Sequence, residues 1–367
     1  MTDRTSPNPT GPLRGLRVVE FAGIGPGPYA AMLLSDMGAD VVRIDRPGIV
    51  PRPQDITARG RRVVNLDLKQ AGDMDAALRL LDGAEALIEG FRPGVMERLG
   101  LGPDVVLARN PRLVYGRMTG WGQDGPQSGF AGHDINYIAI TGALAAIAPP
   151  SGKPVPPLNL VGDYGGGSLF MVMGLLAALL NARATGTGQV VDCAISDCVV
   201  NMLAPLHAML AAGSWQDRPA SNLLDGAAHF YTTYECADGK YISVGAIEPQ
   251  FYALLRERAG LSDPAFDAQR DQAAWPDLQS RAAAIFRSRT RDEWCAMLER
   301  SDACVAPVLS VTEAPAHPHL AARGSFVEVD GLRQPAPAPR FSATPSVART
   351  QAEACTTEAA LREWAAG

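Results

Sequence analysis

The sequence predicts an α/β protein with a Rossmann-like large domain on a parallel sheet and a smaller α+β domain. Strand-like and helix-like runs alternate through the first half of the chain, as in a doubly wound parallel sheet. Turn-rich residues 213–228 and the proline-rich segment Pro335–Pro339 interrupt the regular pattern and indicate connections between domains. The chain has 367 residues, of which 47% are hydrophobic, and this is enough for about two cores.

The strands of the predicted sheet are short runs rich in β-branched and other apolar residues. They are Leu16–Phe21, Asp40–Ile44, Arg62–Leu68, Ala86–Glu89, Leu113–Met118 and Gln189–Ala194. The helical runs between them are Tyr29–Met37, Gly72–Leu81 and Gly167–Ala182. Parallel neighbours need crossover connections, and helices of this kind provide them.

A second, smaller domain is indicated after a helix over Ser196–Ala212. Tyr231–Cys236 and Tyr241–Gly245 flank an Asp-Gly turn, which is a hairpin signal. Helices follow at Pro249–Ala259, Leu278–Arg287, Arg291–Arg300 and Thr356–Ala366. The helix over Arg291–Arg300 is announced by a capping box, Thr290-Arg-Asp-Glu293.

Domain boundaries follow from these interruptions. We expect a disordered tail over 1–12, a large domain over 13–195 completed by 335–367, a linker helix and loop over 196–230, a small domain over 231–326, and a return segment with a C-terminal helix over 327–367.

The composition of the chain argues against several classes of function. The net charge of -6 argues against a nucleic-acid partner. The six cysteines show no C-x-x-C pair and no metal-ligand spacing, which favours reduced thiols in a cytoplasmic protein. Residues 1–12 lack the apolar region of a signal peptide. The most apolar run, Leu169–Leu180, is too short to span a bilayer, so we expect a buried helix there.

The segment Gly25-Pro-Gly-Pro-Tyr-Ala30 matches the G-x-G-x-x-[GA] fingerprint of dinucleotide sites, and Asp45 follows at the expected distance. However, Pro26 and Pro28 remove two backbone N–H groups that would bind a pyrophosphate. Arg46 also directly follows Asp45. A rigid strand-to-helix turn is therefore favoured, and a different adenine nucleotide bound through Arg46 is the sharper hypothesis.

Basic residues lie near the expected strand ends and the loops after them. They are Arg46, Arg61, Arg62, Lys69, Arg92 and Arg98. Loops at one edge of a doubly wound sheet converge on a single crevice, so these side chains indicate an anionic, phosphate-bearing ligand.

Two polar loops carry an imidazole and a carboxylate: Gly132-His133-Asp134-Ile135-Asn136-Tyr137 and Gly162-Asp163-Tyr164-Gly165-Gly166-Gly167. Facing each other across a substrate, the two groups would form a two-base arrangement for moving a carbon-bound proton. Taken singly, His133 could be a hydrogen-bonded loop histidine and Asp163 a helix N-cap. Backbone N–H groups at the helix start after Asp163 would suit an enolate oxygen.

The chain from Leu13 to about Ser346 resembles the family III CoA-transferase superfamily and, within it, the α-methylacyl-CoA racemases. The segments that carry the resemblance are Gly15–Gly23, Asp40–Pro47, Glu89–Gly94, Arg98–Gly100, Gly116–Gly122, the two loops above and Gly245–Phe251. The resemblance implies an acyl-CoA substrate and no metal or other cofactor. It also implies an interlocked homodimer with active sites shared between subunits.

The resemblance also implies roles for individual residues. The catalytic pair would be His133 and Asp163, and Glu248 from the small domain would hydrogen-bond the histidine. The implied CoA contacts are Arg46, Leu66, Asp67, Leu68, Lys69, Gly90, Phe91, Arg92, Arg98, Gly132, Asp134, Ile135, Asn136 and Tyr137.

The implied reaction interconverts (2R)- and (2S)-2-methylacyl-CoA by 1,1-proton transfer through an enolate. The alternative on the same fold is an acyl-CoA:carboxylate CoA-transferase in which Asp163 is the nucleophile. A histidine at position 133 favours the racemase, because a transferase needs no second proton carrier. A set of methionines, Met171, Met173, Met202 and Met209, is interpreted as core in preference to a surface for the acyl chain.

Overall fold

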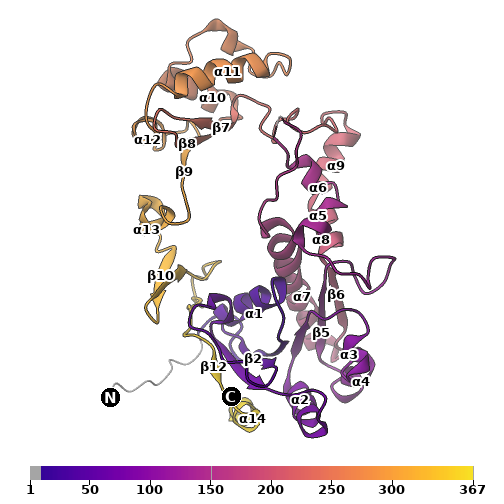
Figure 1. Cartoon of the computed structure of the whole chain (residues 1–367). Coiled ribbons are helices and arrows are strands. Elements are labelled where there is room, and N and C mark those ends of the chain that lie inside the picture. The colour runs from indigo at the N-terminus through magenta and orange to yellow at the C-terminus, as the bar shows by residue number, and fades with distance from the viewer. Residues whose placement is uncertain (1–9, 150, 367) are drawn as a thin grey trace. The chain divides into compact units, whose positions relative to one another are not determined.

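The computed structural model describes residues 10–149 and 151–366, so most of the predicted tail over 1–12 lies outside the described residues. The chain divides into two compact units (Figure 1). The first comprises residues up to 141, Leu158–Met202 and residues from 318, and the second comprises Gly142–Pro157 and Leu203–His317.

The first unit is built on a seven-stranded sheet in the order β12-β3-β2-β1-β4-β5-β6. All neighbouring strands are parallel, which confirms the predicted α/β fold. The strands are β1 (Arg17–Phe21), β2 (Asp40–Asp45), β3 (Arg61–Asn65), β4 (Ala86–Glu89), β5 (Val114–Thr119), β6 (Val190–Ala194) and β12 (Glu353–Ala354).

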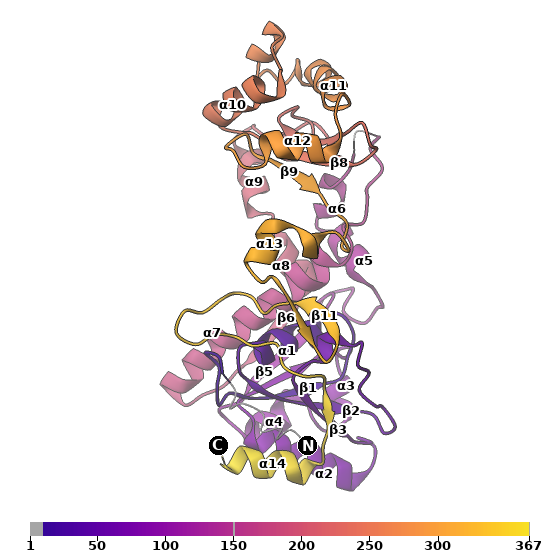
Figure 2. The same cartoon turned by 90° about the vertical axis from the view of Figure 1, so that its left-hand side faces the viewer.

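Helices cover both faces of this sheet. On one face, α2 (Ala71–Gly83) and α14 (Thr357–Ala366) lie side by side, and their apolar side chains share a core with alternate residues of the strands (Figure 2). Trp364 of α14 donates a hydrogen bond from Nε1 to Asp40 Oδ2 at 2.9 Å, which ties the C-terminal helix to the sheet. The other face packs against α1 (Pro26–Asp36) and α7 (Phe170–Thr185).

The helix that carries Asp163 begins earlier than predicted. A π-helical segment, η2 (Leu160–Leu169), runs directly into α7, so the expected start at Gly167 is wrong. The Tyr164 N–H donates to Asn159 O at 3.2 Å, which is the i→i−5 bond of a π-helix. A Cβ added at Gly166 would lie 2.6 Å from Val199 Cγ2, so this glycine permits α8 (Ile195–Met202) to pack closely.

One helix among the described residues, Leu160–Thr185, has the length and apolar composition of a membrane span. Half of its most apolar window is buried inside the protein, and core helices of globular folds meet the same criteria. The helix is therefore weak evidence for a membrane span, although it is longer than the predicted run over Leu169–Leu180.

The second unit has an antiparallel sheet in the order β7-β8-β9, and its first two strands form the predicted hairpin. The strands are β7 (Tyr231–Glu235), β8 (Tyr241–Gly245) and β9 (Val305–Val308), and the helices include α9 (Ala204–Ala211), α10 (Pro249–Ala259), α11 (Trp275–Phe286) and α12 (Arg291–Leu298). The capping box at α12 is present, with Thr290 and Glu293 bonded reciprocally.

The boundaries of the two compact units differ from those of the predicted domains. The predicted helix over Ser196–Ala212 is two helices, α8 and α9, because Pro205 lacks an N–H and begins a new helix. Of these two, α8 packs against η2 and belongs to the first unit, whereas α9 belongs to the second. The hairpin of β10 (Phe326–Val329) and β11 (Leu332–Pro335) belongs to the first unit.

Candidate active site

A cavity of about 490 Å³ opens in the first unit at the carboxyl ends of β1, β4 and β5. Ligands of open α/β sheets bind at this edge. The cavity is lined by Gly25 and the first residues of α1, Pro26–Pro28, which together are called the Gly25–Pro28 loop below. Gly90–Arg92 after β4 and residues of the two predicted catalytic loops, among them His133 and Asp163, complete the lining. The sheet thus brings the two predicted catalytic side chains to one cavity.

His133 stands at the N-terminus of the short helix α5 (Asp134–Ala139). Its backbone N–H donates to Asn136 Oδ1 at 3.1 Å, and this bond fixes the turn into the helix. The His133 side chain is exposed and lines the cavity. Its imidazole is accessible to a ligand in the first unit.

Asp163 lies in the first turn of η2 and is partly buried. Burial, the largest influence, raises the pKa of its carboxyl group, and so does the negative charge of Asp134. A hydrogen bond from Asn159 Nδ2 at 3.5 Å and the nearby His133 lower the pKa. The net shift is upward, so protonated Asp163 is easier to form than an ordinary aspartic acid.

Asp134 anchors the turn that contains Asp163 through a hydrogen bond to its backbone. Its buried carboxylate accepts the Asp163 N–H at Oδ2, at 2.7 Å, while its Oδ1 has no hydrogen-bond partner. A Cβ at Gly162 would lie 2.4 Å from Asp134 Oδ2, so the glycine permits this contact. Asp134 was predicted as a CoA contact, but its side chain does not appear in the cavity lining.

The predicted oxyanion site after Asp163 is not supported. The N–H of Asp163 is bonded to Asp134, and the N–H of Tyr164 is bonded to Asn159 O. Because the helix begins at Leu160, these amides lie inside it and are not the free donors of a helix start.

The predicted CoA residues fall into two groups. Those that line the cavity are Gly90, Phe91, Arg92, Gly132 and Tyr137. Those outside its lining are Arg46, Leu66, Asp67, Leu68, Lys69, Arg98, Asp134, Ile135 and Asn136. Arg46, Lys69 and Arg98 are exposed, but Leu66 is 6% exposed and belongs to the core, so only its backbone is available to a ligand.

The exposed cations Arg46 and Lys69 follow the carboxyl ends of neighbouring strands. The register pairs Asp45 of β2 with Asn65 of β3, so the segments after both strands leave the sheet at the same edge as the cavity. This placement is compatible with one ligand reaching Arg46, Lys69 and Arg92, and their CoA contacts stay predictions.

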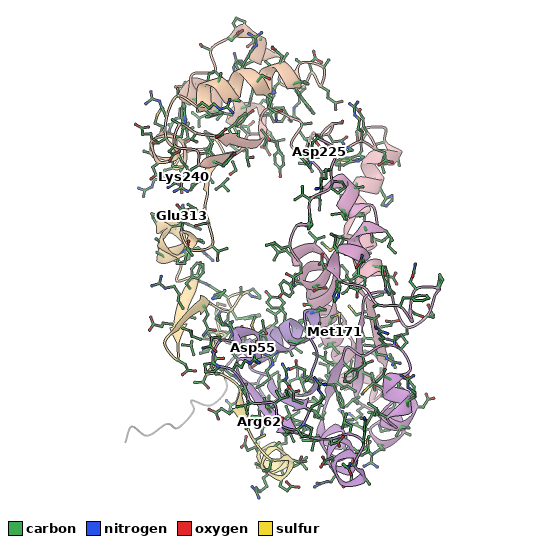
Figure 3. All side chains as sticks on the ribbon, in the orientation of Figure 1. Asp55, Arg62, Met171, Asp225, Lys240 and Glu313 are labelled. Atoms are coloured by element: carbon green, nitrogen blue, oxygen red, sulfur yellow. The ribbon has the colours of Figure 1, made fainter. Side chains whose placement is uncertain are left out.

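Arg61 and Arg62 do not belong to this basic group. Both stand at the amino end of β3, opposite to the cavity edge. Arg61 is fully buried and donates a hydrogen bond from Nε to Glu20 at 3.1 Å. Arg62, labelled in Figure 3, forms ion pairs with Asp40 at 2.7 Å and with Glu363 at 2.8 Å. Their charges are neutralised within the fold, so the expectation of an anionic ligand there is wrong.

The dinucleotide pattern also has another explanation. Asp45 Oδ1 accepts the Arg46 N–H at 2.9 Å and Oδ2 accepts Arg43 Nε at 3.1 Å, so this carboxylate already has partners. A Cβ at Gly25 would lie 3.0 Å from Asp163 Oδ2. The Gly25–Pro28 loop therefore borders the Asp163 carboxylate, a relation that the sequence reasoning missed.

Glu248 lies in the second unit, where it is exposed and precedes α10. Its predicted bond to His133 stays a prediction. Among residues 10–149 and 151–366, no three His, Cys, Asp or Glu side chains gather as a metal site.

The methionine set is only partly core. Met171 is fully buried (Figure 3), whereas Met173 is 58% and Met202 is 42% exposed in the single chain. The interpretation of these two as core is wrong, because Met173 lies on the outer face of α7 and Met202 at the end of α8.

Comparisons with known proteins identify the family of the chain. The family model of CoA-transferase family III matches residues 13–356. The chain is 44% identical over 337 residues to the α-methylacyl-CoA racemase of Mus musculus, which covers 91% of this chain and 88% of the relative. The racemase of Homo sapiens is 42% identical over 338 residues, with the same coverage.

A crystal structure of a CaiB/BaiF family protein from Brucella suis has a TM-score of 0.81 at 25% identity, covering 97% of this chain and 99% of that one. The predicted family is confirmed, and so is the prediction of an enzyme of the isomerase class. The chain belongs to CoA-transferase family III.

Proposed function

We propose that the protein is a racemase that interconverts (2R)- and (2S)-2-methylacyl-CoA thioesters. The observation that carries the proposal is the presence of His133 and Asp163 in the lining of one cavity. The two racemases that share 42–44% identity with the chain supply the reaction class.

In this proposal, the neutral imidazole of His133 removes the α-proton from one face of the thioester. The electron pair of the C–H bond forms an enolate, and the protonated carboxyl group of Asp163 returns a proton to the opposite face. In the reverse direction, the Asp163 carboxylate removes the proton and the His133 imidazolium donates it. The upward shift of the Asp163 pKa suits this role, because it makes the protonated form that donates the proton easier to populate.

The CoA part of the substrate would extend over the carboxyl edge of the sheet. Arg92 lines the cavity, and Arg46 and Lys69 follow neighbouring strands at the same edge. These cations would bind the phosphates of CoA, which is part of the substrate. The proposed chemistry uses no further cofactor and no metal ion, and we propose that it takes place in the cytoplasm.

We further propose a homodimer in which Glu248 of the partner subunit orients His133. A carboxylate at the second ring nitrogen fixes the tautomer of a catalytic histidine. Support comes from large apolar side chains that are exposed in the single chain. They include Leu169 at 53%, Met173 at 58% and Leu180 at 71%. Sedimentation that gives a monomer at working concentration would contradict the shared site.

The alternative is CoA transfer, in which the Asp163 carboxylate attacks the thioester carbonyl, expels CoA thiolate and forms a mixed anhydride. CoA thiolate then attacks the aspartyl carbonyl and releases the acyl group as a free acid. Asp163 lines the cavity, where its carboxylate can serve as either a base or a nucleophile, so its position does not distinguish the two reactions. His133 in the same lining favours the racemase, because transfer requires no second proton carrier.

The experiment is NMR of (2S)-2-methylacyl-CoA with the enzyme in D₂O, with and without an added free carboxylic acid. Loss of the α-proton signal with epimerisation, independent of the free acid, is expected for the racemase. Retention of the α-proton with passage of CoA to the added acid would instead identify a transferase.

A further inference from the structure

The Gly25–Pro28 loop has the pattern of a dinucleotide site but borders the carboxylate of Asp163. We propose that this loop positions the Asp163 side chain for proton transfer, with Gly25 as the positioning residue. The inference rests on the proposed function, since it assigns a role relative to the proposed acid/base pair.

Gly25 is the point of closest approach. Its φ is 68° and its ψ is -117°, a backbone conformation that side-chain-bearing residues rarely adopt. A Cβ built on Gly25 would lie 3.0 Å from Asp163 Oδ2 and 3.7 Å from Asp163 Cγ. Only a hydrogen atom fits between this backbone and the carboxylate without moving one of them. Gly25 therefore limits where the Asp163 carboxylate can lie.

The rest of the loop is joined to the Asp163 helix. The buried Ser168 hydroxyl lies 2.7 Å from Pro26 O and 3.1 Å from Asp163 O, so its single proton links loop and helix. A Cβ at Gly167 would lie 3.0 Å from Pro26 Cβ, so the proline packs directly on the helix backbone. The loop is thus joined to the turn that bears Asp163 by a hydrogen bond and by direct packing.

Tyr29 of α1 makes one further contact with the segment that carries Asp163. The rings of Tyr29 and Tyr164 lie 4.6 Å apart at 38°, with Tyr164 next to Asp163 in the chain. The ring pair adds an aromatic contact between α1 and the turn that bears Asp163.

The prolines explain why this loop suits a carboxylate of its own chain better than a nucleotide. Pro26 and Pro28 hold φ near its fixed value, so the loop loses little entropy on ordering. They also leave Gly27 as the one residue among the first three helical positions with an N–H. A pyrophosphate would find few donors there, while the glycine at 25 leaves room for the Asp163 oxygen.

Other polar groups facing Asp163 come from different elements. Asp134 and His133 act on its charge, Asn159 donates a hydrogen bond to it, and Tyr137 lies close enough for its own pKa to be raised in part by Asp163. These groups belong to α5 and to the residues before η2. The Gly25 loop contributes no charge, so its role is to fix the position of the carboxylate.

The test is Gly25→Ala, with Gly15→Ala as the matched control. Gly15 also has a positive φ, of 85°, but a Cβ there would meet nothing within 4 Å. Exchange of the α-proton in D₂O is followed separately for each enantiomer of 2-methylacyl-CoA. Asp163→Asn and His133→Ala identify which enantiomer each residue deprotonates, and CoA affinity checks that the site is intact.

We expect Gly25→Ala to slow exchange of the enantiomer that Asp163 deprotonates by about three- to tenfold. The added Cβ forces the carboxylate to shift by a few tenths of an ångström, and a displacement of about 1 Å would cost about 10²-fold. Exchange of the other enantiomer and CoA affinity should stay near those of the Gly15→Ala protein. Equal loss for both enantiomers, or no loss, would overturn the proposal. If the unsubstituted protein exchanges neither enantiomer, the proposed function fails instead.

A second variant covers the case in which Gly25→Ala does not fold. Ser168→Ala removes the hydroxyl that links Pro26 O and Asp163 O, and it introduces no positive-φ strain. The same one-sided loss is expected, up to about tenfold, the worth of one hydrogen bond. A symmetrical loss or an unchanged ratio of the two exchange rates would overturn the positioning role.

Discussion

His229 gives the second unit a defined sensitivity to acid. The side chain is 2% exposed and packs edge-on against Phe230 and Tyr252. Its Nε2 lies 2.7 Å from the Tyr252 hydroxyl oxygen, while its Nδ1 is buried without a hydrogen-bond partner. Burial lowers the pKa of His229 from its ordinary 6.5 to about 4. The folded unit therefore holds this histidine neutral well below pH 6.5.

The consequence is a loss of stability on acidification. Below pH 6.5 the unfolded chain binds a proton at His229 that the folded chain does not bind until about pH 4. The free energy of unfolding therefore falls as the pH drops through this window and is unaffected by His229 above about pH 7.5. At pH 5 the two pKa values correspond to a loss of about 2 kcal/mol relative to pH 8.

The assay is urea unfolding at pH 8 and pH 5, followed by fluorescence of Trp275 and Trp294, which lie in the core of the second unit. Other groups also titrate, so the comparison is between His229→Gln and the unsubstituted protein. The variant should lose about 2 kcal/mol less on acidification, whereas His319→Gln, at an exposed histidine, should behave like the unsubstituted protein. Equal pH dependence of the His229→Gln and unsubstituted proteins would refute the burial argument.

Three further predictions concern the first unit. His133→Ala should reduce turnover by about 10²–10⁴-fold, and Asp163→Asn should do similar damage while CoA affinity is retained, as steady-state kinetics and calorimetry would show. Arg46→Ala should weaken CoA binding with little effect on the chemical step, so normal affinity would remove Arg46 from the site. Gly166→Ala should lower the free energy of unfolding by about 1–3 kcal/mol in urea titration, because its Cβ would lie 2.6 Å from Val199 Cγ2.

The parallel sheet and the hairpin were predictable because alternation of elements and turn chemistry are local signals. The two segments with His133 and Asp163 were predictable as parts of one site from their polarity and from family resemblance. The start of η2 at Leu160 was not, because a glycine run suggests a flexible loop until its packing against α8 is known. Arg61 and Arg62 were assigned to the wrong edge, although residues at the start of a strand belong to the amino edge of a parallel sheet.

The Gly25–Pro28 loop shows why a sequence motif can be right about geometry and wrong about the ligand. A glycine turn from a strand into a helix creates a small space beside the first helical turn, where negative charge is favoured. In a dinucleotide enzyme a pyrophosphate occupies that space. In this chain the space holds the carboxylate of Asp163, with Oδ2 3.0 Å from the Cβ position of Gly25. Burial is the largest influence on the pKa of this carboxyl group and raises it, so the protonated form is easier to populate than in an ordinary aspartic acid. Proton transfer in both directions requires both forms of the group, and the raised pKa makes the proton-donating form more accessible.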